Sequence, residues 1–547
     1  MVLLPKVGKP PNDPSAYRPL CMLNTAGKAL ESIIAGRLTE ELEENGALEE
    51  TQFGFRRGRS TLTAVDYVMG IARKEREKTL KTRRLCLAVL FDVRNAFNSM
   101  SWEVIIRALR ESGVSPYLQK IISSYLRDRD VRSGERKYGV TAGVPQGSVL
   151  GPTLWNIAYN GVLKLKMPEG IKMVAYADDL ALVVTAKDKD TLATRANDAI
   201  ETIASWMDDH KLELAPEKTE AILLIGRKKS GPINLDVRGH NIEVKRSVKY
   251  LGIVLDQGMT FSPHINYVLE KAMKSVAALS RLMPRVGGAG EGKRRLLATV
   301  AESIVLYGAP IWSRDALKCA RNRNRLSSVQ RLLAIKVCRA YRTVSTKVAL
   351  GLARLIPWTL LAGERRKLYE NRELGKEDAR TETLNEWQSE WSLESEVCRD
   401  VRVAVPGAWT RKIIPNIGMW FRREHGTLSY HLTQMLSGHG CFEAYLHRIG
   451  KADNPQCVHC DSGEIDDAEH TLLKCKKFSE SRRRMMQILS GSGIEATYVD
   501  AEKIVNCMLE SQEKWNAVDA FATEVINEKE RNERERKVLR QHAEEEQ

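Results

Sequence analysis

The stretch MVAYADDLALVV, residues 173–184, places two adjacent acids inside an otherwise apolar run. The flanking residues, 173–176 and 180–184, have the composition of two buried strands, so the acids are predicted at the tip of a tight hairpin. Neighbouring carboxylates repel each other and resist burial unless a cation compensates them. Asp-Asp also occurs at 208–209 and 466–467, but there in polar surroundings where water solvates the charges. The hairpin therefore predicts a cation site, with an ordinary Asp-rich turn as the alternative.

A second acid follows a strand-like run further upstream. Residues 85–91 (LCLAVLF) are apolar throughout, as in a strand covered on both faces, and Asp92 comes directly after them. If this strand lies beside the hairpin, Asp92 meets Asp178 and Asp179, and three carboxylates in one place require divalent cations. Mg²⁺ prefers oxygen ligands, and two such ions support phosphoryl transfer. We predict two Mg²⁺ ions, replaceable by Mn²⁺, at these three acids; for Asp92 alone, helix capping is the alternative.

Composition restricts the class of protein. The 547 residues are 43% hydrophobic, which is enough for several domains with real cores. The net charge of +15 and the pI near 9.2 favour a nucleic-acid partner, and a merely basic protein is the alternative. No apolar run approaches the ~20 residues of a membrane span, so no membrane partner is expected. Ten scattered cysteines indicate a reduced, intracellular chain rather than a disulfide framework.

The pattern of the chain changes near residue 260. From about 85 to 255, short apolar runs alternate with helical patterns, and between them lies the Gly- and Pro-rich loop 143–152, which lets backbone approach a ligand closely. Beyond about 260 the pattern is almost entirely helical. Residues 314–347 carry ten Lys or Arg and one acid, which predicts a helix that tracks nucleic-acid backbone, or simply a solvated basic face. The charged run 527–547 predicts a solvated helix end or a frayed tail.

A cysteine and histidine cluster interrupts the helical part. CVHCDSGEIDDAEHTLLKC has the spacing Cys457-x2-Cys460-x9-His470-x4-Cys475. Thiolates and an imidazole at this spacing suit one closed tetrahedral Zn²⁺ site, and unliganded reduced cysteines are the alternative. His459 competes with His470 for the fourth position. Such a knuckle binds single-stranded RNA or acts as a structural staple, and both interpretations stay open.

The order of these motifs resembles the palm of reverse transcriptases. DVRNAF (92–97) is similar to their motif A, GVPQGSVLGPTLWN (143–156) to motif B and YADD (176–179) to motif C. KTEAILL (218–224) and VKYLGIVLD (248–256) resemble motifs D and E. LPKVGKP, YRPLCML and QFGFRRGRST upstream resemble the fingers of non-LTR retrotransposon enzymes. VLYGAPIW (305–312) and the segment 437–460 resemble the region after the thumb in arthropod elements that insert at specific sites.

The resemblance implies an α+β fold, a right-hand polymerase of fingers, palm and thumb with a mainly helical C-terminal extension and a small zinc knuckle. The implied domains are fingers and palm over 1–255, thumb and basic helices over 256–345, a helical connection over 346–450, a CCHC zinc knuckle over 451–480 and a helical charged tail over 481–547. Family members usually carry more N-terminal sequence, including an endonuclease, so an N-terminally truncated chain is expected.

The implied activity is RNA-directed DNA synthesis by target-primed reverse transcription. A primer 3′-hydroxyl would attack the α-phosphate of a dNTP, with the element's RNA as template and nicked chromosomal DNA as primer. This implies action in the nucleus after a cytoplasmic ribonucleoprotein stage. Two alternatives stay open: a catalytically inactive element remnant that only binds RNA, and a maturase of the group II intron type.

The resemblance also assigns residues to the substrates. For the incoming nucleotide they are Lys6, Arg18, Gln146, Gly147 and Phe97. Phe97 matches the gate whose ring excludes a ribose 2′-hydroxyl, and an ordinary core aromatic is the alternative. Candidates for template phosphates are Arg56, Arg57 and Arg59. The primer grip would be formed by Tyr250, Leu251 and Gly252.

Overall fold

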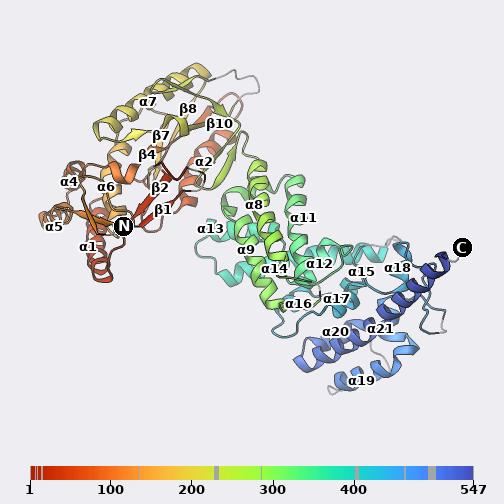
Figure 1. Ribbon diagram of the computed structural model, residues 1–547. Helices are drawn as coiled ribbons and strands as arrows, with labels where there is room; N and C mark the ends of the chain where they lie inside the picture. The colour runs from red at the N-terminus through yellow and green to blue at the C-terminus, as the bar shows by residue number, and fades with distance from the viewer. Residues whose placement is uncertain are drawn as a thin grey trace. The chain divides into compact units, whose positions relative to one another are not determined.

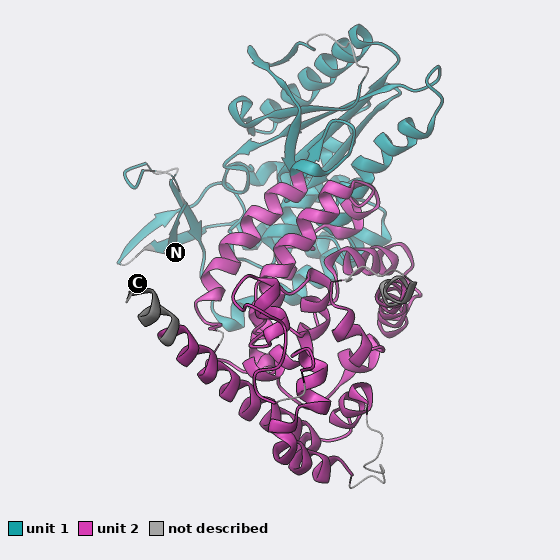
Figure 2. Cartoon of the chain, turned by 90° about the vertical axis from the view of Figure 1, so that its right-hand side faces the viewer, with its two compact units in different colours: residues 1–263 teal, residues 264–547 magenta. Residues whose placement is uncertain are grey.

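In the computed structural model the chain divides into two compact units, residues 1–263 and 264–547 (Figure 2). The structure describes residues 2–6, 8, 10–13, 16–133, 135–226, 233–284, 286–400, 406–460, 463–490 and 500–545. The first unit combines strands and helices, and the second is built of helices (Figure 1). The predicted α+β fold with a mainly helical C-terminal extension is confirmed.

A five-stranded sheet of order β13–β10–β3–β8–β7 forms the centre of the first unit. β3 (Leu85–Phe91), β8 (Asp179–Ala186) and β7 (Ile171–Tyr176) lie antiparallel in this order. β10 (Glu220–Ile225) is antiparallel to β3, whereas β13 (Val244–Lys245) is parallel to β10. All seven residues of β3 are buried, as its apolar run predicts for a strand covered on both faces.

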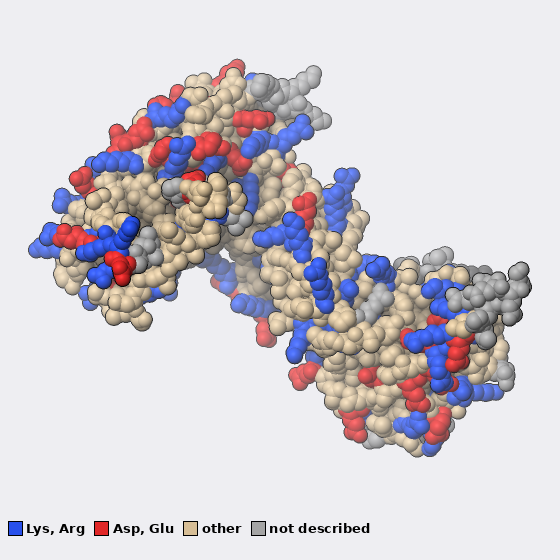
Figure 3. Space-filling model, viewed as in Figure 1, with Lys and Arg blue, Asp and Glu red and all other residues tan. Residues whose placement is uncertain are grey.

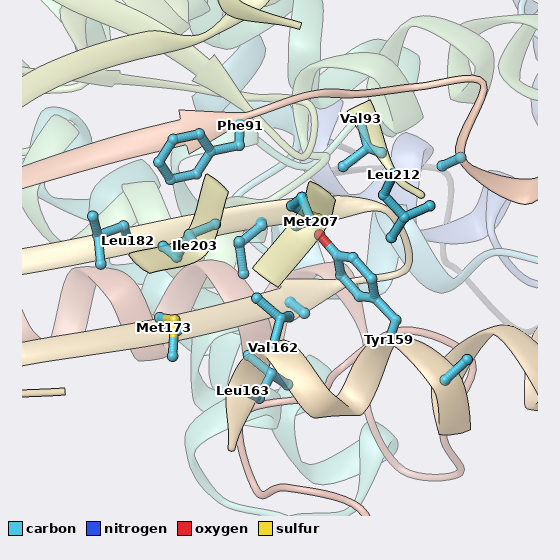
Figure 4. Packing of buried hydrophobic residues seen from close by; sticks show 14 of the residues in the cluster. Phe91, Val93, Tyr159, Val162, Leu163, Met173, Leu182, Ile203, Met207 and Leu212 are labelled. Atoms are coloured by element: carbon cyan, nitrogen blue, oxygen red, sulfur yellow. The ribbon is translucent and has the colours of Figure 1, made fainter. Parts of the chain in front are cut away.

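Helices cover the sheet. α6 (Gly151–Leu163) and α7 (Lys189–Asp209) pack over one face, where Phe91, Leu182 and Met173 meet Val162, Ile203 and Met207 (Figure 4). α2 (Thr61–Glu77) contacts β3, β7 and β10, and its buried side chains include Val65, Val68 and Met69. Side chains alternate between the faces of a strand, so β3 contributes to both cores. Each buried side chain of this size stabilises the fold by ~1.5–3 kcal/mol, which holds the strand ends in a fixed register.

Smaller elements surround this sheet in the first unit. The hairpins and strand pairs are β1 (Val2–Pro5) with β2 (Tyr17–Leu20), β4 (Val93–Arg94) with β9 (Glu213–Leu214), β5 (Asp130–Ser133) with β6 (Arg136–Gly139), β11 (Leu235–Val237) with β12 (His240–Ile242), and β14 (Ser247–Tyr250) with β15 (Ile253–Asp256). The remaining helices are α1 (Thr25–Glu44), α3 (Ala96–Ser99), α4 (Trp102–Glu111), α5 (Pro116–Leu126) and the 3₁₀ turn Pro216–Lys218.

The second unit contains a succession of helices. They are α8 (Ser262–Ser280), which begins at the boundary, α9 (Glu291–Val305), α10 (Ala309–Ala316), α11 (Ala320–Val337), α12 (Thr346–Ala353), α13 (Trp358–Glu370), α14 (Lys376–Asp400), α15 (Ala408–Ile413), α16 (Ile417–Arg422), α17 (Tyr430–Ser437), α18 (Glu443–Arg448), a π-helical turn (His470–Lys474), α19 (Ser479–Leu489), α20 (Ala501–Met508) and α21 (Gln512–Glu545). Among the described helices, none alone is long and apolar enough to cross a membrane, and α9 and α10, bent by 76°, meet these criteria only as a pair.

The charged end of the chain differs from the prediction in one respect. α21 continues through the run that the sequence predicts as a solvated helix end or frayed tail. Its apolar stripe, which includes Trp515 and Val525, is buried, and Lys529 within the charged run is also buried and only 1% exposed. The Lys529 ammonium group donates to both carboxylate oxygens of buried Asp466, at 2.6 and 2.7 Å. This ion pair fixes α21 to the Cys/His segment.

Candidate active site and metal centre

The Asp178–Asp179 pair lies at the tip of the predicted hairpin. β7 and β8 pair from Ile171 with Val184 to Tyr176 with Asp179, which leaves a two-residue loop of Ala177 and Asp178. Ala177 has a φ of 57°, in the left-handed region that such tight turns require. Gly54 packs against this tip so closely that a Cβ there would lie 2.1 Å from the Ala177 nitrogen. The glycine of the QFGFRRGRST motif therefore supports the turn that presents the acids.

Asp92 lies at the same end of the sheet. β3 pairs with β8 up to Phe91 opposite Leu180, so Asp92, the residue that follows β3, comes beside Asp179. The Asp92 carbonyl oxygen accepts a hydrogen bond from the Ala215 nitrogen at 2.8 Å, which fixes the backbone after the strand. The predicted juxtaposition of the three acids thus follows from the register of a buried sheet.

A lysine that the sequence analysis left without a role completes this cluster. The Lys218 ammonium group donates to the Asp92 carboxylate, with Nζ 2.7 Å from Oδ2. Lys218 ends the 3₁₀ turn Pro216–Lys218 and is the first residue of KTEAILL. Its place at the start of the segment resembling motif D is the sequence signal that could have identified it.

Burial and mutual repulsion raise the pKa values of both hairpin acids, an effect we call the electrostatic load of the site. Burial and the charge of Asp92 raise the pKa of Asp178, while its own backbone N–H, Arg18 and Lys218 oppose this rise. Loss of solvation, followed by the charges of Asp178 and Asp92, raises the pKa of the Asp179 carboxyl to about 6. Burial also raises the pKa of the Tyr159 hydroxyl in α6, and both hairpin acids add to this shift. Cations bound at the acids would relieve this load.

The donor set of the three aspartates fits hard divalent cations. Among the described residues, the groups of three or more metal-ligating side chains whose ligand atoms all lie within 4.8 Å of one another are both in the second unit. The three aspartates are not among these groups, and Lys218 engages one oxygen of Asp92. Three carboxylates at a partly solvated edge offer only oxygen ligands, which suits Mg²⁺ and Mn²⁺.

Four of the residues assigned to the incoming nucleotide come from two segments, 6–21 and 146–147, which a backbone hydrogen bond joins. Arg18 lies on β2, and its charge reaches Asp178. The Gln146 carbonyl accepts from the nitrogen of Cys21, just after β2, at 2.8 Å. Gly147 has a φ of 100°, and a Cβ there would lie 2.8 Å from the Cys21 carbonyl oxygen. Lys6 follows β1 and is exposed. Its backbone nitrogen donates to the Ala16 carbonyl at 2.6 Å.

Phe97 lies in an aromatic cluster beside this loop. Its ring is half-buried on α3, 4.9 Å from the Trp155 ring and 6.2 Å from the Phe55 ring by their centroids. The Phe97 carbonyl accepts from the Val144 nitrogen at 2.7 Å, which ties α3 to the Gly-rich loop. The ring is therefore held in position by packing and still has an accessible side.

The three arginines of QFGFRRGRST have different surroundings. Arg56 donates to both carboxylate oxygens of Glu43, at 2.9 and 2.6 Å, and its side chain is only 8% exposed. Arg59 pairs with Glu50 at 2.7 Å and lies over the Phe53 ring. Arg57 is exposed. Two of these candidates are thus engaged in scaffold contacts, and Arg57 is the one that faces solvent.

The candidate primer grip is a tight hairpin. β14 and β15 pair up to Tyr250 opposite Ile253, and the two loop residues, Leu251 and Gly252, have φ values of 44° and 87°. Tyr250 is only 3% exposed, and its pKa is raised by burial and by the charge of Asp179. Its ring therefore belongs to the core near the acids, while the half-buried tip offers backbone to a ligand.

The second unit holds the Cys/His cluster. The metal-ligating atoms of Cys457, Cys460, His470 and Cys475 all lie within 4.8 Å of one another. The Sγ atoms of Cys457 and Cys475 are 3.9 Å apart, and Cys460 Sγ lies 3.5 Å from His470 Nε2. The π-helical turn that starts at His470 lets the Cys475 nitrogen donate to the His470 carbonyl at 2.8 Å, which brings the last two ligands together. Three thiols and one imidazole fit tetrahedral Zn²⁺.

A carboxylate orients the histidine of this cluster. His470 Nδ1 lies 2.8 Å from Glu464 Oε2, so Nε2 is left facing the thiols. Zinc-bound histidines commonly donate their other ring nitrogen to a carboxylate in this way. His459, the competing candidate, lies instead with Glu443 and Asp466. The carboxylates of that second group are already paired with Arg536 and Lys529, so their charge is compensated without a metal.

The sequence of the chain is similar to known polymerases and retrotransposon proteins. Residues 4–274 match the family model described as reverse transcriptase (RNA-dependent DNA polymerase). The chain is 30% identical over 538 residues to the putative 115 kDa protein in type-1 retrotransposable element R1DM of Drosophila melanogaster, which covers 94% of this chain and 50% of that protein. It is 27% identical over 512 residues to the retrovirus-related Pol polyprotein from type-1 retrotransposable element R1 of Bradysia coprophila, with coverages of 88% and 48%.

A third relative comes from another element. The probable RNA-directed DNA polymerase from transposon BS of Drosophila melanogaster is 29% identical over 358 residues, which is 62% of this chain and 38% of that protein. The chain therefore spans about half the length, or less, of these relatives.

Proposed function

The chain belongs to the reverse transcriptases of non-LTR retrotransposons, and from this premise we propose that it synthesises DNA on an RNA template. The observation that carries the proposal is the placement of Asp92 beside Asp178 and Asp179 at the end of a buried antiparallel sheet. The relative from transposon BS, named as a probable RNA-directed DNA polymerase, supports the same activity.

Asp92, Asp178 and Asp179 would hold two Mg²⁺ ions. Such ions, when bound, activate the primer 3′-hydroxyl and stabilise the charge on the transferring and leaving phosphate oxygens. Arg18, whose charge already reaches Asp178, would bind the triphosphate together with Lys6. Lys218 compensates the Asp92 charge until the cations bind. The product is a primer longer by one deoxynucleotide, with release of pyrophosphate.

The nucleic-acid contacts proposed for the first unit are made by residues whose side chain or backbone is accessible. Phe97, fixed against Trp155, would exclude a ribose 2′-hydroxyl, and Gln146 would lie over the paired base. Arg57 would contact a template phosphate because it is the exposed arginine of its motif. The Leu251–Gly252 tip would contact the primer through backbone.

The second unit offers a basic surface and a metal centre. Exposed basic side chains lie along α10 and the start of α11, namely Arg314, Lys318, Arg321, Arg323 and Arg325. Figure 3 shows Lys and Arg side chains along the helices that Figure 1 colours green, with few acids among them. We propose that this surface adds salt-dependent affinity for RNA or primer DNA. One Zn²⁺ at Cys457, Cys460, His470 and Cys475 is proposed to hold the knuckle together.

The relatives from retrotransposable elements extend the proposal to a cellular setting. The template would be the element's own RNA and the primer nicked chromosomal DNA, which requires action in the nucleus after a cytoplasmic ribonucleoprotein stage. The R1-type relatives support this extension by their origin in such elements.

Primer extension tests the proposed activity. The purified chain with Mg²⁺, poly(rA)/oligo(dT) and dTTP is expected to extend the primer, and Asp178→Asn is expected to abolish extension while leaving RNA binding intact. Asp209→Asn is the matched control, because Asp209 belongs to an exposed Asp-Asp pair at the end of α7. A wild-type chain that binds RNA but never extends a primer would identify an inactive element remnant instead.

The proposed gate has its own test. Phe97→Ala removes the ring that would meet a 2′-hydroxyl, so the preference for dTTP over UTP is expected to fall by at least about 10-fold. Because Phe97 also packs against Trp155, the thermal stability of the variant is measured in parallel. Unchanged discrimination in a folded, active variant would make Phe97 a core aromatic only.

A further inference from the structure

A cavity in the second unit takes no part in the proposed polymerase chemistry. It has a volume of about 550 Å³ and is lined by residues of 343–348, 406–409, 437–449 and 467–469. We propose that this cavity binds an unstacked base of single-stranded RNA, with Arg448 at its rim contacting the flanking phosphate or stacking on the base. The inference deepens the proposed function, because it names a second contact for the RNA that the polymerase would copy.

One wall of the cavity is an ordered set of rings. The Thr343 hydroxyl lies 2.9 Å from His439 Nδ1 and 2.7 Å from the Tyr445 hydroxyl, so it bridges both side chains. The ring centroids of His439 and Tyr445 are 4.9 Å apart. The Arg448 guanidinium lies 5.2 Å from the centre of the Tyr445 ring. Planar groups fixed in this way are the stacking platforms that unpaired bases use.

Trp409 contributes a further ring whose position is also fixed. Its indole nitrogen donates to the Met435 carbonyl at 2.8 Å. Gly438 ends α17 with a φ of 66°, and a Cβ at this glycine would lie 3.2 Å from Trp409 Cδ1. The glycine thus lets the chain turn tightly into His439 beside the indole. The segment SGHG, to which the sequence analysis assigned no role, builds this side of the cavity.

The charged groups at the cavity are two acids and one arginine. The Asp467 carboxylate accepts a hydrogen bond from the backbone nitrogen of His470 at 2.8 Å, and the charge of Glu469 is compensated by the Lys412 ammonium group at 2.8 Å. Burial and the charge of Arg448 lower the pKa of His439 to about 4, so this imidazole is neutral near pH 7, with Nδ1 2.9 Å from the Thr343 hydroxyl and Nε2 3.5 Å from the Arg448 guanidinium group. Exposed Arg448 supplies the positive charge at the rim.

The cavity is continuous in sequence with the Cys/His cluster. Residues 467–469 line the cavity, and the next residue, His470, is a member of the cluster. Zinc knuckles recognise single-stranded RNA, which is why RNA rather than DNA is the ligand proposed here. The volume lies within the ~300–1,000 Å³ of typical ligand pockets.

Binding measurements on the full chain test the inference. The probe is a fluorescent 12-nucleotide single-stranded RNA of mixed sequence, titrated by anisotropy at fixed salt. Arg448→Ala and His439→Ala are each expected to weaken binding by at least about 5-fold, in line with the loss of one stacked base. Arg448→Lys is expected to restore only part of this affinity, because it returns the charge without the planar group. Arg483→Ala is the control: it removes one exposed arginine that pairs with Glu480 on α19, and it should change affinity less than 2-fold.

Crosslinking separates this cavity from other RNA contacts. With 4-thiouridine in the same RNA, the wild-type chain is expected to yield a crosslinked peptide from 437–450, and Arg448→Ala is expected to lose it. Unchanged affinity of a folded Arg448→Ala variant, or absence of that peptide in the wild type, would overturn the proposal. Equal or stronger effects with single-stranded DNA of the same length would overturn its assignment to RNA.

The outcome is independent of the polymerase test. If the wild type extends a primer but Arg448→Ala binds RNA normally, only the cavity inference is wrong. If no extension occurs and Arg448→Ala still weakens RNA binding, the cavity inference stands and the polymerase proposal fails.

Discussion

The two candidate metal sites of this chain are built in opposite ways. The Cys/His set of the second unit lies within 19 residues of sequence, 457–475, and its ligand atoms already stand within 4.8 Å of one another. The aspartates of the first unit come from neighbouring strands that are far apart in sequence, and Lys218 engages one of these acids. The first arrangement is a closed site with its histidine oriented by Glu464, and the second is an open, charged edge.

The chemistry of the ligands explains the difference. Neutral thiols and a neutral imidazole carry no charges that repel one another, so they can pack closely. Carboxylates near pH 7 remain charged and repel, so their approach depends on cations that also bind the substrate phosphates. A closed site suits a structural metal, while an open site with perturbed pKa values suits catalysis.

The largest effect is expected from removing one aspartate of the open site, because this site is proposed to carry the catalysis. Asp92→Asn is expected to lower primer extension by at least about 10³-fold, which corresponds to ~4 kcal/mol of transition-state stabilisation. The zinc content of the same variant should stay unchanged, because the Cys/His set lies in the other unit. A variant that keeps more than about a tenth of wild-type extension would contradict the role of Asp92 in the site.

Removing a ligand from the closed site is expected to destabilise the fold around it and to leave primer extension largely intact. Cys475→Ser removes a fully buried ligand. Metal analysis is expected to find one zinc ion per wild-type chain and none in this variant. Limited proteolysis should then cleave the region around 437–480 faster, while extension of oligo(dT) on poly(rA) falls less than about 3-fold. Zinc retained in this variant would remove the proposed metal centre.

A smaller effect is expected from the carboxylate that orients His470. Glu464→Gln should weaken zinc binding by about 10-fold, measured by competition with a chelator, because the imidazole loses its charged partner. Glu469→Gln is the matched control, since Glu469 pairs with Lys412 and does not contact the cluster ligands through its carboxylate. Equal affinities for both variants would mean that Glu464 has no part in the site.

The smallest effect concerns the pH dependence of folding without divalent cations. The pKa of Asp179 is raised to about 6 in the folded chain, above its ordinary value of 3.8, so the folded state binds this proton more tightly than the unfolded state. Stability from this group is therefore greatest below about pH 4 and is lost as the pH rises through 6. Asp179→Asn should melt higher than the wild type at pH 7, and the difference should shrink towards pH 4. A lower melting temperature at pH 7 would argue against electrostatic load at Asp179.

The sequence was sufficient wherever a feature depends on local pattern. The all-apolar run before Asp92 and the acids at a hairpin tip follow from periodicity, and the Cys/His spacing identified four side chains that converge. What it could not supply are contacts set by register and packing. Lys218 reaches Asp92 only because β10 follows its turn beside β3, and Lys529 reaches Asp466 only because α21 returns to the knuckle.

The arginines of QFGFRRGRST show the same limit. Arg56 and Arg57 are neighbours with equal claims in the sequence, yet Arg56 is held by Glu43 and Arg57 is exposed. Which of two adjacent arginines faces solvent is decided by the acids that tertiary packing brings near, and no pattern in the motif records it.

A crystal structure of the chain soaked with Mn²⁺ and a dNTP shows whether Asp92 and Asp178 hold the cations together. Anomalous density for Mn²⁺ is expected between Asp92 and Asp178, at the ~2.0–2.2 Å ligand distances of such cations, with the Lys218 ammonium group displaced from Asp92. A fully soaked crystal with no Mn²⁺ at these acids, or with Lys218 still bound to Asp92, would contradict this joint role of the two acids.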